Sequence, residues 1–397
     1  RSAGGGGPEV AADAPTRAPT PSFSGRAREG RGKGNGDGIG SDGRTEQAIE
    51  MGLVYLAQMQ LADGSWSLHR FPGATEADAG IYRSDTAATG LSLLAYLGAG
   101  YDHYDDKYRD TVRRGLEYLL RNQKPNGDLF MPMDRQYSTK EFNVNSVARL
   151  YSHSIATIAV CEALGMTGDK RLREPAQKAV NFLVAAQSRR TGGWRYEPGE
   201  GGDVSVTGWA VTALKSGELA GLQVPKQTYQ RASQFFDSAQ ASKQDGSRYL
   251  YNPDDRQAQL PNDNQRPTMT AVALLGRIYT GWSRENPNMV RAAEFIKANP
   301  PRMSDKYGRD TYYWYYATQV MFQLGGDYWK SWNERLHPML INSQITGGPY
   351  AGSWDPRAPV PDRWGEVCGR IYVTAMNLLS LEVYYRHLPI YEVPEPK

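Results

Sequence analysis

The stretch Gln60-Leu61-Ala62-Asp63-Gly64-Ser65-Trp66 decides the fold, because variants of it recur along the chain. In most copies a small residue is followed by an aromatic residue three positions later and by glutamine eight positions later. The copies are Gly52-Tyr55-Gln60, Gly115-Tyr118-Gln123, Ala179-Phe182-Gln187, Ala232-Phe235-Gln240, Ala292-Phe295-Pro300 and Leu336-Met339-Gln344. A unit repeated six times at regular spacing is typical of a repeat architecture.

Six apolar segments with helical periodicity alternate with these copies. They cover residues 85–97, 151–164, 203–219, 268–279, 311–324 and 371–385. Glycine at positions 98, 165, 221, 281 and 325 follows five of them, where a helix C-terminal cap is expected. The repeat copies themselves are more amphipathic. We therefore predict an all-α fold of six hairpins, with the apolar helices inside and the amphipathic helices outside.

Residues 1–44 are rich in glycine, proline, serine and alanine. Such a stretch buries too little apolar surface to offset its ordering entropy, so we predict a disordered tail or linker over 1–44 and one folded domain over 45–397. The sequence begins with arginine, which leaves room for an anchor upstream, and we expect an exported or membrane-tethered protein. It has no run of 18 apolar residues, so we predict no transmembrane segment within it.

The charge balance argues against nucleic acid as a partner. The chain has 46 basic and 43 acidic residues and a formal net charge of +3, which gives no strong attraction to a polyanion. Cys161 and Cys368 are too few for a disulfide framework, and we expect two buried thiols. We expect a monomer by default, since the pattern contains no obvious apolar surface patch.

The repeat resembles the QW repeat of the squalene cyclase and protein-prenyltransferase superfamily, from about residue 45 to residue 391. The resemblance implies an (α/α)6 toroid, a ring of six helical hairpins. It does not by itself imply cyclase chemistry, because one architecture can serve many functions.

The acid of class II terpene cyclases is missing from the matching positions. In that class the middle Asp of a D-x-D-D-T-A motif protonates an alkene. Here Ser84 and Ser205 stand at that position in the two best matches, and a hydroxyl is not a strong enough acid. We therefore expect no class II cyclase activity.

Zinc is a weak alternative. The resemblance to prenyltransferases points to Glu366 and Cys368 at the right spacing and to His153 on another inner helix, and these are residue types that bind Zn²⁺. However, His153 and Cys368 belong to hairpins that are not neighbours in a ring of six. We expect no cofactor.

The candidate ligand site is the rim where the N-termini of the inner helices meet, because helix N-termini and nearby arginines attract anions. The candidate ligand-binding residues are Arg83, Arg149, Trp209, Arg266, Arg309, Tyr312, Arg370 and Tyr372. The successive aromatic residues 312–316 cannot all face the cavity, since neighbours on a helix point about 100° apart.

Four carboxylates at the same rim are weak catalytic candidates: Asp85, Asp203, Asp310 and Glu366. Two of them at a suitable separation could perform acid–base chemistry on a sugar. The structural alternative is that Asp85 and Asp310 cap helices and pair with Arg83 and Arg309.

Three functions remain open from the sequence. The leading hypothesis is a toroid that binds a small anionic, sugar-like or isoprenoid ligand, or a protein partner, at this rim, and it leans away from an enzyme. The alternative is a prenyltransferase-like or saccharide-active enzyme with its site at the same rim. The third is a purely structural or interaction module.

Overall fold

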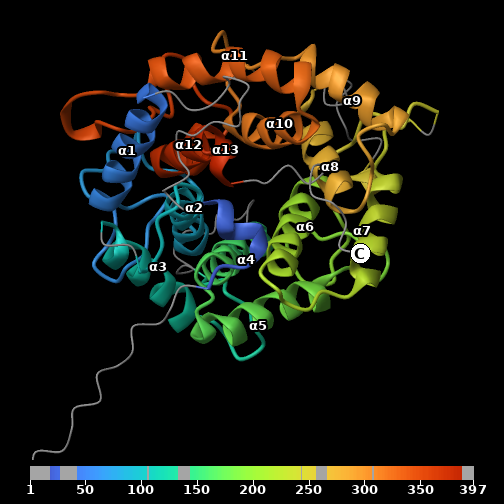
Figure 1. Cartoon of the computed structure of the whole chain (residues 1–397), viewed down its shortest axis with the longest axis horizontal. Helices are drawn as coiled ribbons and strands as arrows, with labels where there is room; N and C mark the ends of the chain where they lie inside the picture. Colours follow the sequence, from blue (N-terminus) through green and yellow to red (C-terminus); the bar gives the residue numbers. More distant parts are fainter. Residues whose placement is uncertain are drawn as a thin grey trace, which may run out of the picture.

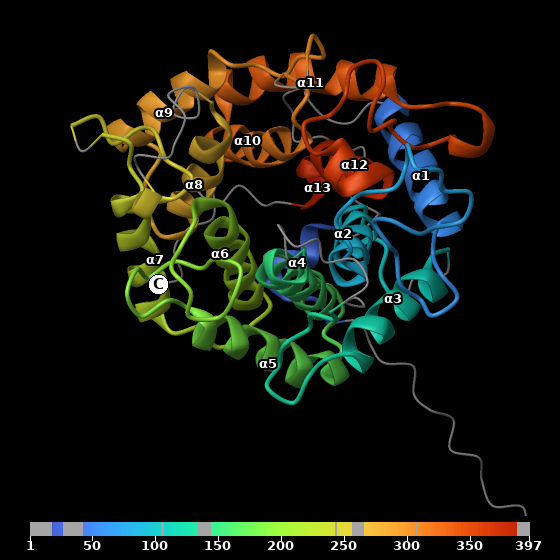
Figure 2. The same ribbon diagram turned by 180° about the vertical axis from the view of Figure 1, so that it is seen from behind.

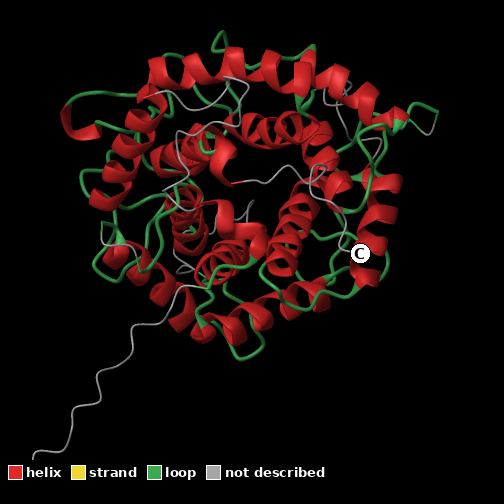
Figure 3. Ribbon diagram, in the orientation of Figure 1, coloured by secondary structure: helices red, strands yellow, loops and turns green. Residues whose placement is uncertain are grey.

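The computed structural model describes residues 18–26, 43–104, 107–132, 144–242, 244–255, 266–305 and 308–386. Helices dominate these ranges (Figure 3). Apart from one isolated bridge between Gln240 and Tyr249, the described residues form no β-structure. The all-α prediction is confirmed.

The helices form two concentric rings (Figure 1). The inner ring consists of α2 (Asp85–Gly98), α4 (Val144–Thr167), α6 (Val204–Leu219), α8 (Thr268–Tyr279), α10 (Thr311–Leu324) and α12 (Gly365–Leu381). The outer ring consists of α1 (Gly43–Gln58), α3 (Arg109–Arg121), α5 (Lys170–Ala186), α7 (Lys226–Ser238), α9 (Pro287–Lys297) and α11 (Gly326–Ser343). The view from behind shows the same closed ring (Figure 2). The expected (α/α)6 toroid is therefore confirmed.

Burial explains which helices are inside. Every residue of α2 is buried, as expected for an apolar helix with neighbours on all sides. In contrast, α3 buries a single stripe and exposes its charged face. That stripe contains Val112, Gly115, Leu116, Tyr118 and Leu119. The amphipathic helices therefore cover the apolar ring with one face and meet solvent with the other.

The repeated glutamine joins consecutive outer helices. Gln60 Nε2 donates to the Gly64 carbonyl in its own turn and to the Thr111 carbonyl of α3, each over 2.9 Å. Gln123, Gln187 and Gln344 make the same pair of contacts, to a turn glycine and to the next outer helix. The repeat is therefore a hydrogen-bonding unit that sets the spacing of the hairpins.

In three of the repeats, a tryptophan ties the turn to its own hairpin. Trp66 is fully buried; its indole N–H donates to the Leu56 carbonyl of α1, and its backbone N–H donates to Thr89 Oγ1 of α2. Trp194 and Trp354 repeat this arrangement. A Cβ on Gly115 would lie 2.9 Å from the Trp66 ring, so the indole also packs against the next hairpin.

Two helix ends differ from the expectation. Gly98 is the last residue of α2 and Gly165 lies inside α4, and the left-handed conformation falls instead on Gly100 and Gly168, at φ 76° and 67°. α2 therefore ends one residue later than expected and α4 three residues later. The expected positions at 221, 281 and 325 do have positive φ.

A short 3₁₀ helix, η1 (Pro21–Arg26), packs on the inner ring within the stretch that composition led us to read as a linker. The backbone N–H groups of Ala18 and Thr20 donate to the Thr167 and Gly165 carbonyls at the end of α4. Phe23 is 3% exposed and contacts Gly165. The segment therefore covers the face where the inner helices end. In the described part of the chain, no helix is long and apolar enough to cross a membrane.

Candidate active site

The N-terminal halves of the inner helices and the loops that precede them line a cavity of about 370 Å³. It is lined by Leu68, Tyr82, Ser84, Ala87, Leu91, Tyr151, Ser152, Ile155, Tyr196, Ser205, Trp209, Tyr251, Arg266, Thr268, Met269, Tyr312, Arg363, Trp364, Cys368 and Tyr372. We call this space the aromatic cavity. All six inner helices contribute residues to it, so the cavity forms only when the ring is closed.

Hydrogen-bonded hydroxyl groups lie at two places in the aromatic wall of this cavity. Ser205 Oγ lies 2.7 Å from Tyr151 Oη and 2.6 Å from Tyr312 Oη, which joins α4, α6 and α10. On the other side, Ser84 Oγ lies 2.7 Å from Ser152 Oγ. Among the described lining residues there is no carboxylate and no histidine. The wall is therefore suited to an apolar ligand with few polar groups.

A second, smaller cavity of about 140 Å³ adjoins the first. Its lining contains three arginines, Arg266, Arg302 and Arg363, and one carboxylate, Asp310. Arg266, Thr268 and Arg363 line both cavities. We call the smaller space the arginine cavity. The two together form a site with an apolar compartment and a cationic compartment.

Four of the eight predicted ligand-binding residues line the aromatic cavity: Trp209, Arg266, Tyr312 and Tyr372. Of the aromatic residues 312–316, Tyr312 is the one that lines the aromatic cavity in the described part of the chain. Tyr313 lines the arginine cavity instead. Trp209 stacks on Tyr315 at 5.4 Å between ring centroids, which fixes the indole against the wall.

The other four predicted residues, Arg83, Arg149, Arg309 and Arg370, line neither cavity. Arg309 is 1% exposed and donates to the carbonyls of Ala358, Val360 and Asp355. Arg370 is buried and binds Asp78 and Asp355. Carbonyl and carboxylate oxygens of the loops bind both guanidinium groups. Arg309 and Arg370 therefore hold these loops in place instead of binding a ligand.

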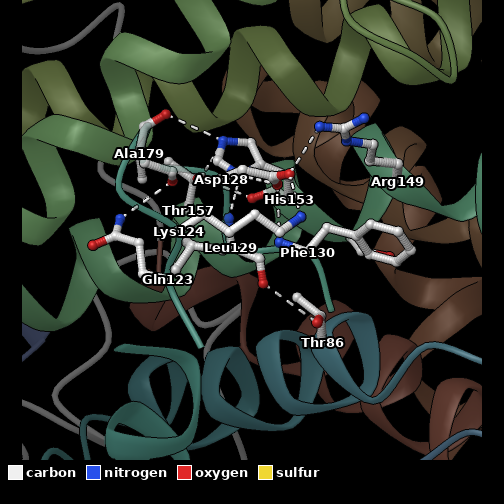
Figure 4. A network of polar contacts seen from close by, with 12 residues as sticks. Thr86, Gln123, Lys124, Asp128, Leu129, Phe130, Arg149, His153, Thr157 and Ala179 are labelled. Carbon is white, nitrogen blue, oxygen red and sulfur yellow. Dashed lines mark hydrogen bonds and ion pairs between the residues drawn. The ribbon is translucent and has the colours of Figure 1, made fainter. Parts of the chain in front are cut away.

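Arg149 and His153 belong to a polar network behind the cavity wall (Figure 4). Arg149 pairs with Asp128 at 3.1 Å and with Glu197 at 2.7 Å. His153 Nδ1 accepts the Leu129 N–H, so its Nε2 donates to the Ala179 carbonyl. Burial lowers the pKa of His153 to about 4, and the ring is neutral at physiological pH.

The residues considered for zinc do not come together. His153 faces α5, whereas Cys368 lines the aromatic cavity and Glu366 is exposed on the first turn of α12. Within the described ranges, no three His, Cys, Asp or Glu side chains are grouped to hold a metal ion. Burial also raises the pKa of the Cys368 thiol well above its usual value, which disfavours the thiolate that binds zinc.

The rim aspartates act mainly at helix starts, but not all as expected. Ser84, rather than Asp85, caps α2 by accepting the Ala87 N–H, and Asp85 pairs with Arg70 at 2.6 Å instead of with Arg83. Asp310 does cap α10, through the Tyr313 N–H. Its nearby guanidinium is that of Arg363, at 3.8 Å, because Arg309 turns towards the loop carbonyls.

Three buried carboxyl groups near the two cavities, those of Asp203, Asp310 and Asp362, hold protons more tightly than usual. Asp203 caps α6 through the Val206 N–H, and desolvation raises its pKa to about 7. Asp362 accepts the N–H groups of Thr311 and Trp364, and desolvation together with the nearby Asp310 raises its pKa to about 7. Asp362 could not be recognised from the sequence, because it lies in a loop and precedes α12 by three residues.

Several lining residues were also missed. Tyr82, Tyr196, Tyr251 and Arg363 lie on loops, where helical periodicity gives no signal. Trp364 immediately precedes α12 and Arg302 follows α9. The aromatic richness of these loops was the one available hint.

The comparisons with known proteins support the fold. No family model matches the sequence, and no curated protein matches it. Among solved structures, the chain is similar to an α-amylase from Clostridium perfringens (TM-score 0.55, 13% identity, 85% of this chain and 97% of that chain). It is also similar to the type II terpene cyclase MstE from Scytonema (0.53, 13%, 86% and 97%) and to a cellobiose 2-epimerase from Bacillus thermoamylovorans (0.57, 12%, 85% and 97%).

These likenesses correct one expectation. The sequence reading leaned towards a non-enzymatic binding protein, and this was wrong, because the solved toroids named above are enzymes. At 12–13% identity the likeness establishes the fold and not the reaction. The choice among reactions has to come from the cavities.

Proposed function

We propose that this protein is an enzyme that converts an isoprenoid diphosphate, with the hydrocarbon chain in the aromatic cavity and the diphosphate in the arginine cavity. The observation that carries the proposal is the junction of the two cavities, where Arg266, Thr268 and Arg363 border both. A ligand that fills both compartments must be apolar at one end and anionic at the other.

The aromatic wall supports chemistry through a positively charged intermediate. The faces of tyrosine and tryptophan rings attract cations, by about 0.5–2 kcal/mol each, and more strongly where water is excluded. Trp209, Tyr312, Trp364 and Tyr372 border the same space from three inner helices. An allylic carbocation formed there is stabilised by the ring faces, and the described lining has no carboxylate or histidine that would trap it.

The arginine cavity supports departure of the diphosphate. When the carbon–oxygen bond breaks, the electron pair leaves with the diphosphate, and the allylic carbon becomes the cation. Arg266, Arg302 and Arg363 can share the charge of the leaving group, because guanidinium groups bind phosphate oxygens in a bidentate way. The starts of α8 and α10 at the same place add favourable helix dipoles.

Two other reactions fit less well. Ionisation of a diphosphate needs no strong acid at the positions of Ser84 and Ser205, whereas protonation of an alkene does. Glycoside hydrolysis requires a pair of carboxyl groups flanking the bond, and within the described lining the aromatic cavity has no carboxylate.

Calorimetric titration tests the proposal with four probes: farnesyl diphosphate, farnesol, inorganic diphosphate and cellobiose. We expect the first to bind at least ten-fold more tightly than farnesol or inorganic diphosphate alone, because it occupies both compartments. Phosphorus NMR would then follow release of inorganic diphosphate over time, with and without Mg²⁺. Binding of cellobiose without binding of farnesyl diphosphate would overturn the proposal in favour of a saccharide enzyme.

A further inference from the structure

We propose that Asp203 is the proton store of the aromatic cavity and exchanges its proton with the substrate through the hydroxyl groups of Tyr251 and Tyr196. This inference rests on the proposed function of the cavity. Tyr251 and Tyr196 line the cavity, whereas Asp203 does not. Asp203 is therefore a positioning residue, which acts on the substrate only through these two tyrosines.

The position of Asp203 is unusual for a helix cap. Its Oδ1 accepts the Val206 N–H at 2.8 Å, as a capping oxygen should. Its Oδ2 is buried and has no hydrogen-bond partner among the described residues, and the residue is 0% exposed. An ionised carboxylate with one buried oxygen unsatisfied is costly, whereas a protonated carboxyl group can donate from that oxygen.

Tyrosines are prominent among the groups that interact electrostatically with Asp203. Besides desolvation, the charge of Asp203 contributes to raising the pKa of Tyr251 and Tyr196 on loops, of Tyr151 on α4 and of Tyr312 on α10. The charged group that faces it is Arg195, which opposes the upward shift of its pKa. Desolvation outweighs that guanidinium, and the pKa stays near 7.

A path leads from Asp203 to the cavity. The Val204 N–H donates to the Tyr251 carbonyl at 2.8 Å, which holds Tyr251 against the first turn of α6 beside Asp203. The Tyr251 side chain is one of the groups that stabilise the ionised form of Asp203. Tyr251 Oη lies 2.7 Å from Tyr196 Oη, and both side chains line the aromatic cavity.

The step balances without another reactant. A C–H bond next to the carbocation breaks, and its electron pair becomes the new carbon–carbon double bond. The proton passes to Tyr196 Oη while Tyr196 gives its own proton to Tyr251 and Tyr251 gives its proton to the Asp203 carboxylate. The cation and the carboxylate are both neutralised, and Asp203 releases the proton later, which a pKa near 7 permits.

The first experiment does not depend on turnover. Infrared difference spectroscopy of the whole protein between pH 5 and 9 should show carboxyl C=O bands that titrate near pH 7. Asp203→Asn should remove one band, and Asp362→Asn, the matched control whose pKa is also raised to about 7, should remove a different one. If Asp203→Asn removes no band, the carboxyl group is ionised throughout and the proposal is overturned, whatever the substrate.

The second experiment uses the reaction. Asp203→Asn keeps a capping oxygen for Val206 but cannot take a proton, so kcat should fall about 100-fold, while the binding of farnesyl diphosphate and KM stay close to wild type. The pH–rate profile should lose its inflection near 7. Tyr251→Phe and Tyr196→Phe should have the same effect, because each breaks the path and leaves packing intact.

A purely structural Asp203 gives a different result. In that case Asp203→Asn leaves the inflection in place, and the tyrosine variants behave like wild type. Failure of farnesyl diphosphate to bind wild-type protein would count against the proposed function. The infrared bands would still show whether Asp203 holds a proton near pH 7.

Discussion

The side chain of Gln344 donates a hydrogen bond of 2.8 Å to the carbonyl of Ala48, 296 positions earlier in the sequence. This contact joins α11 to α1 and closes the ring. Gln187 makes the same contact between α5 and α7, over 41 positions. The repeated glutamine therefore sets the spacing of neighbouring hairpins, and its last copy, Gln344, also closes the toroid.

We predict that Gln344→Leu costs about 1–3 kcal/mol of unfolding free energy, because buried carbonyl groups lose their donor. Gln187→Leu is the matched control and should cost a similar amount in denaturant titrations. Hydrogen exchange should differ between them, however. In Gln344→Leu the protection of α1 and α11 should fall selectively, and equal loss around the ring would contradict a special role in closure.

Arg26 should fasten η1 to the ring. Its Nη1 lies 2.7 Å from Glu162 Oε2, and Arg386 holds the other carboxylate oxygen at 3.0 Å. Although burial acts in the opposite direction, the two guanidinium groups lower the pKa of Glu162 to about 2. We predict that Arg26→Met costs about 1–3 kcal/mol and exposes η1 to proteolysis. Unchanged cleavage around residue 26 would argue against this anchor.

The same cluster predicts acid sensitivity. The folded-state pKa of Glu162 is below its ordinary value of 4.5, so its contribution is present above pH 4.5 and is lost as the pH falls towards 2. We expect the unfolding free energy of the wild type to fall in this window. Glu162→Gln should be less stable at pH 7 and should lack this part of the pH dependence.

For Asp203 we predict a pH dependence of the unfolding free energy that is opposite to that of Glu162. Its folded-state pKa of about 7 lies above the ordinary 3.8, so its contribution is present at low pH and is lost as the pH rises from about 4 to 7. Asp203→Asn should therefore gain stability relative to wild type when the melting temperature is measured at pH 8 rather than at pH 4. A constant difference between the two proteins would mean that Asp203 is not shifted.

The two compartments should separate by mutation. Ala87→Phe places a ring in the aromatic cavity and should weaken farnesol binding at least ten-fold, about 1.4 kcal/mol, while inorganic diphosphate binds as before. Arg302→Gln should weaken inorganic diphosphate by a similar factor and leave farnesol unchanged. If both variants affect both probes equally, the cavities do not divide the ligand as proposed.

The ring could be predicted from sequence because its spacing is set locally. The glutamine and the turn glycine lie within a few residues of each other, so their contact leaves a regular trace. The burial of the inner helices is equally visible, since it makes them apolar on all sides.

The site could be predicted only in part. Trp209 and Tyr312 occupy the first two turns of α6 and α10, and their positions follow from helix order. Tyr196 and Tyr251 depend on loop paths fixed by distant contacts, such as the bond from Val204 to the Tyr251 carbonyl. Nothing in the sequence says whether Arg309 turns to a ligand or to the Ala358 carbonyl.

The docking of η1 gives the ring a front and a back. Thr20 Oγ1 donates to the Leu219 carbonyl at the end of α6, so the chain joins the ring on the face opposite the N-terminal halves of the inner helices, which line the cavity. An affinity tag placed before Ala18 should therefore hold the protein by its back. On a sensor surface, the end of the ring that carries the cavity would then point away from the surface.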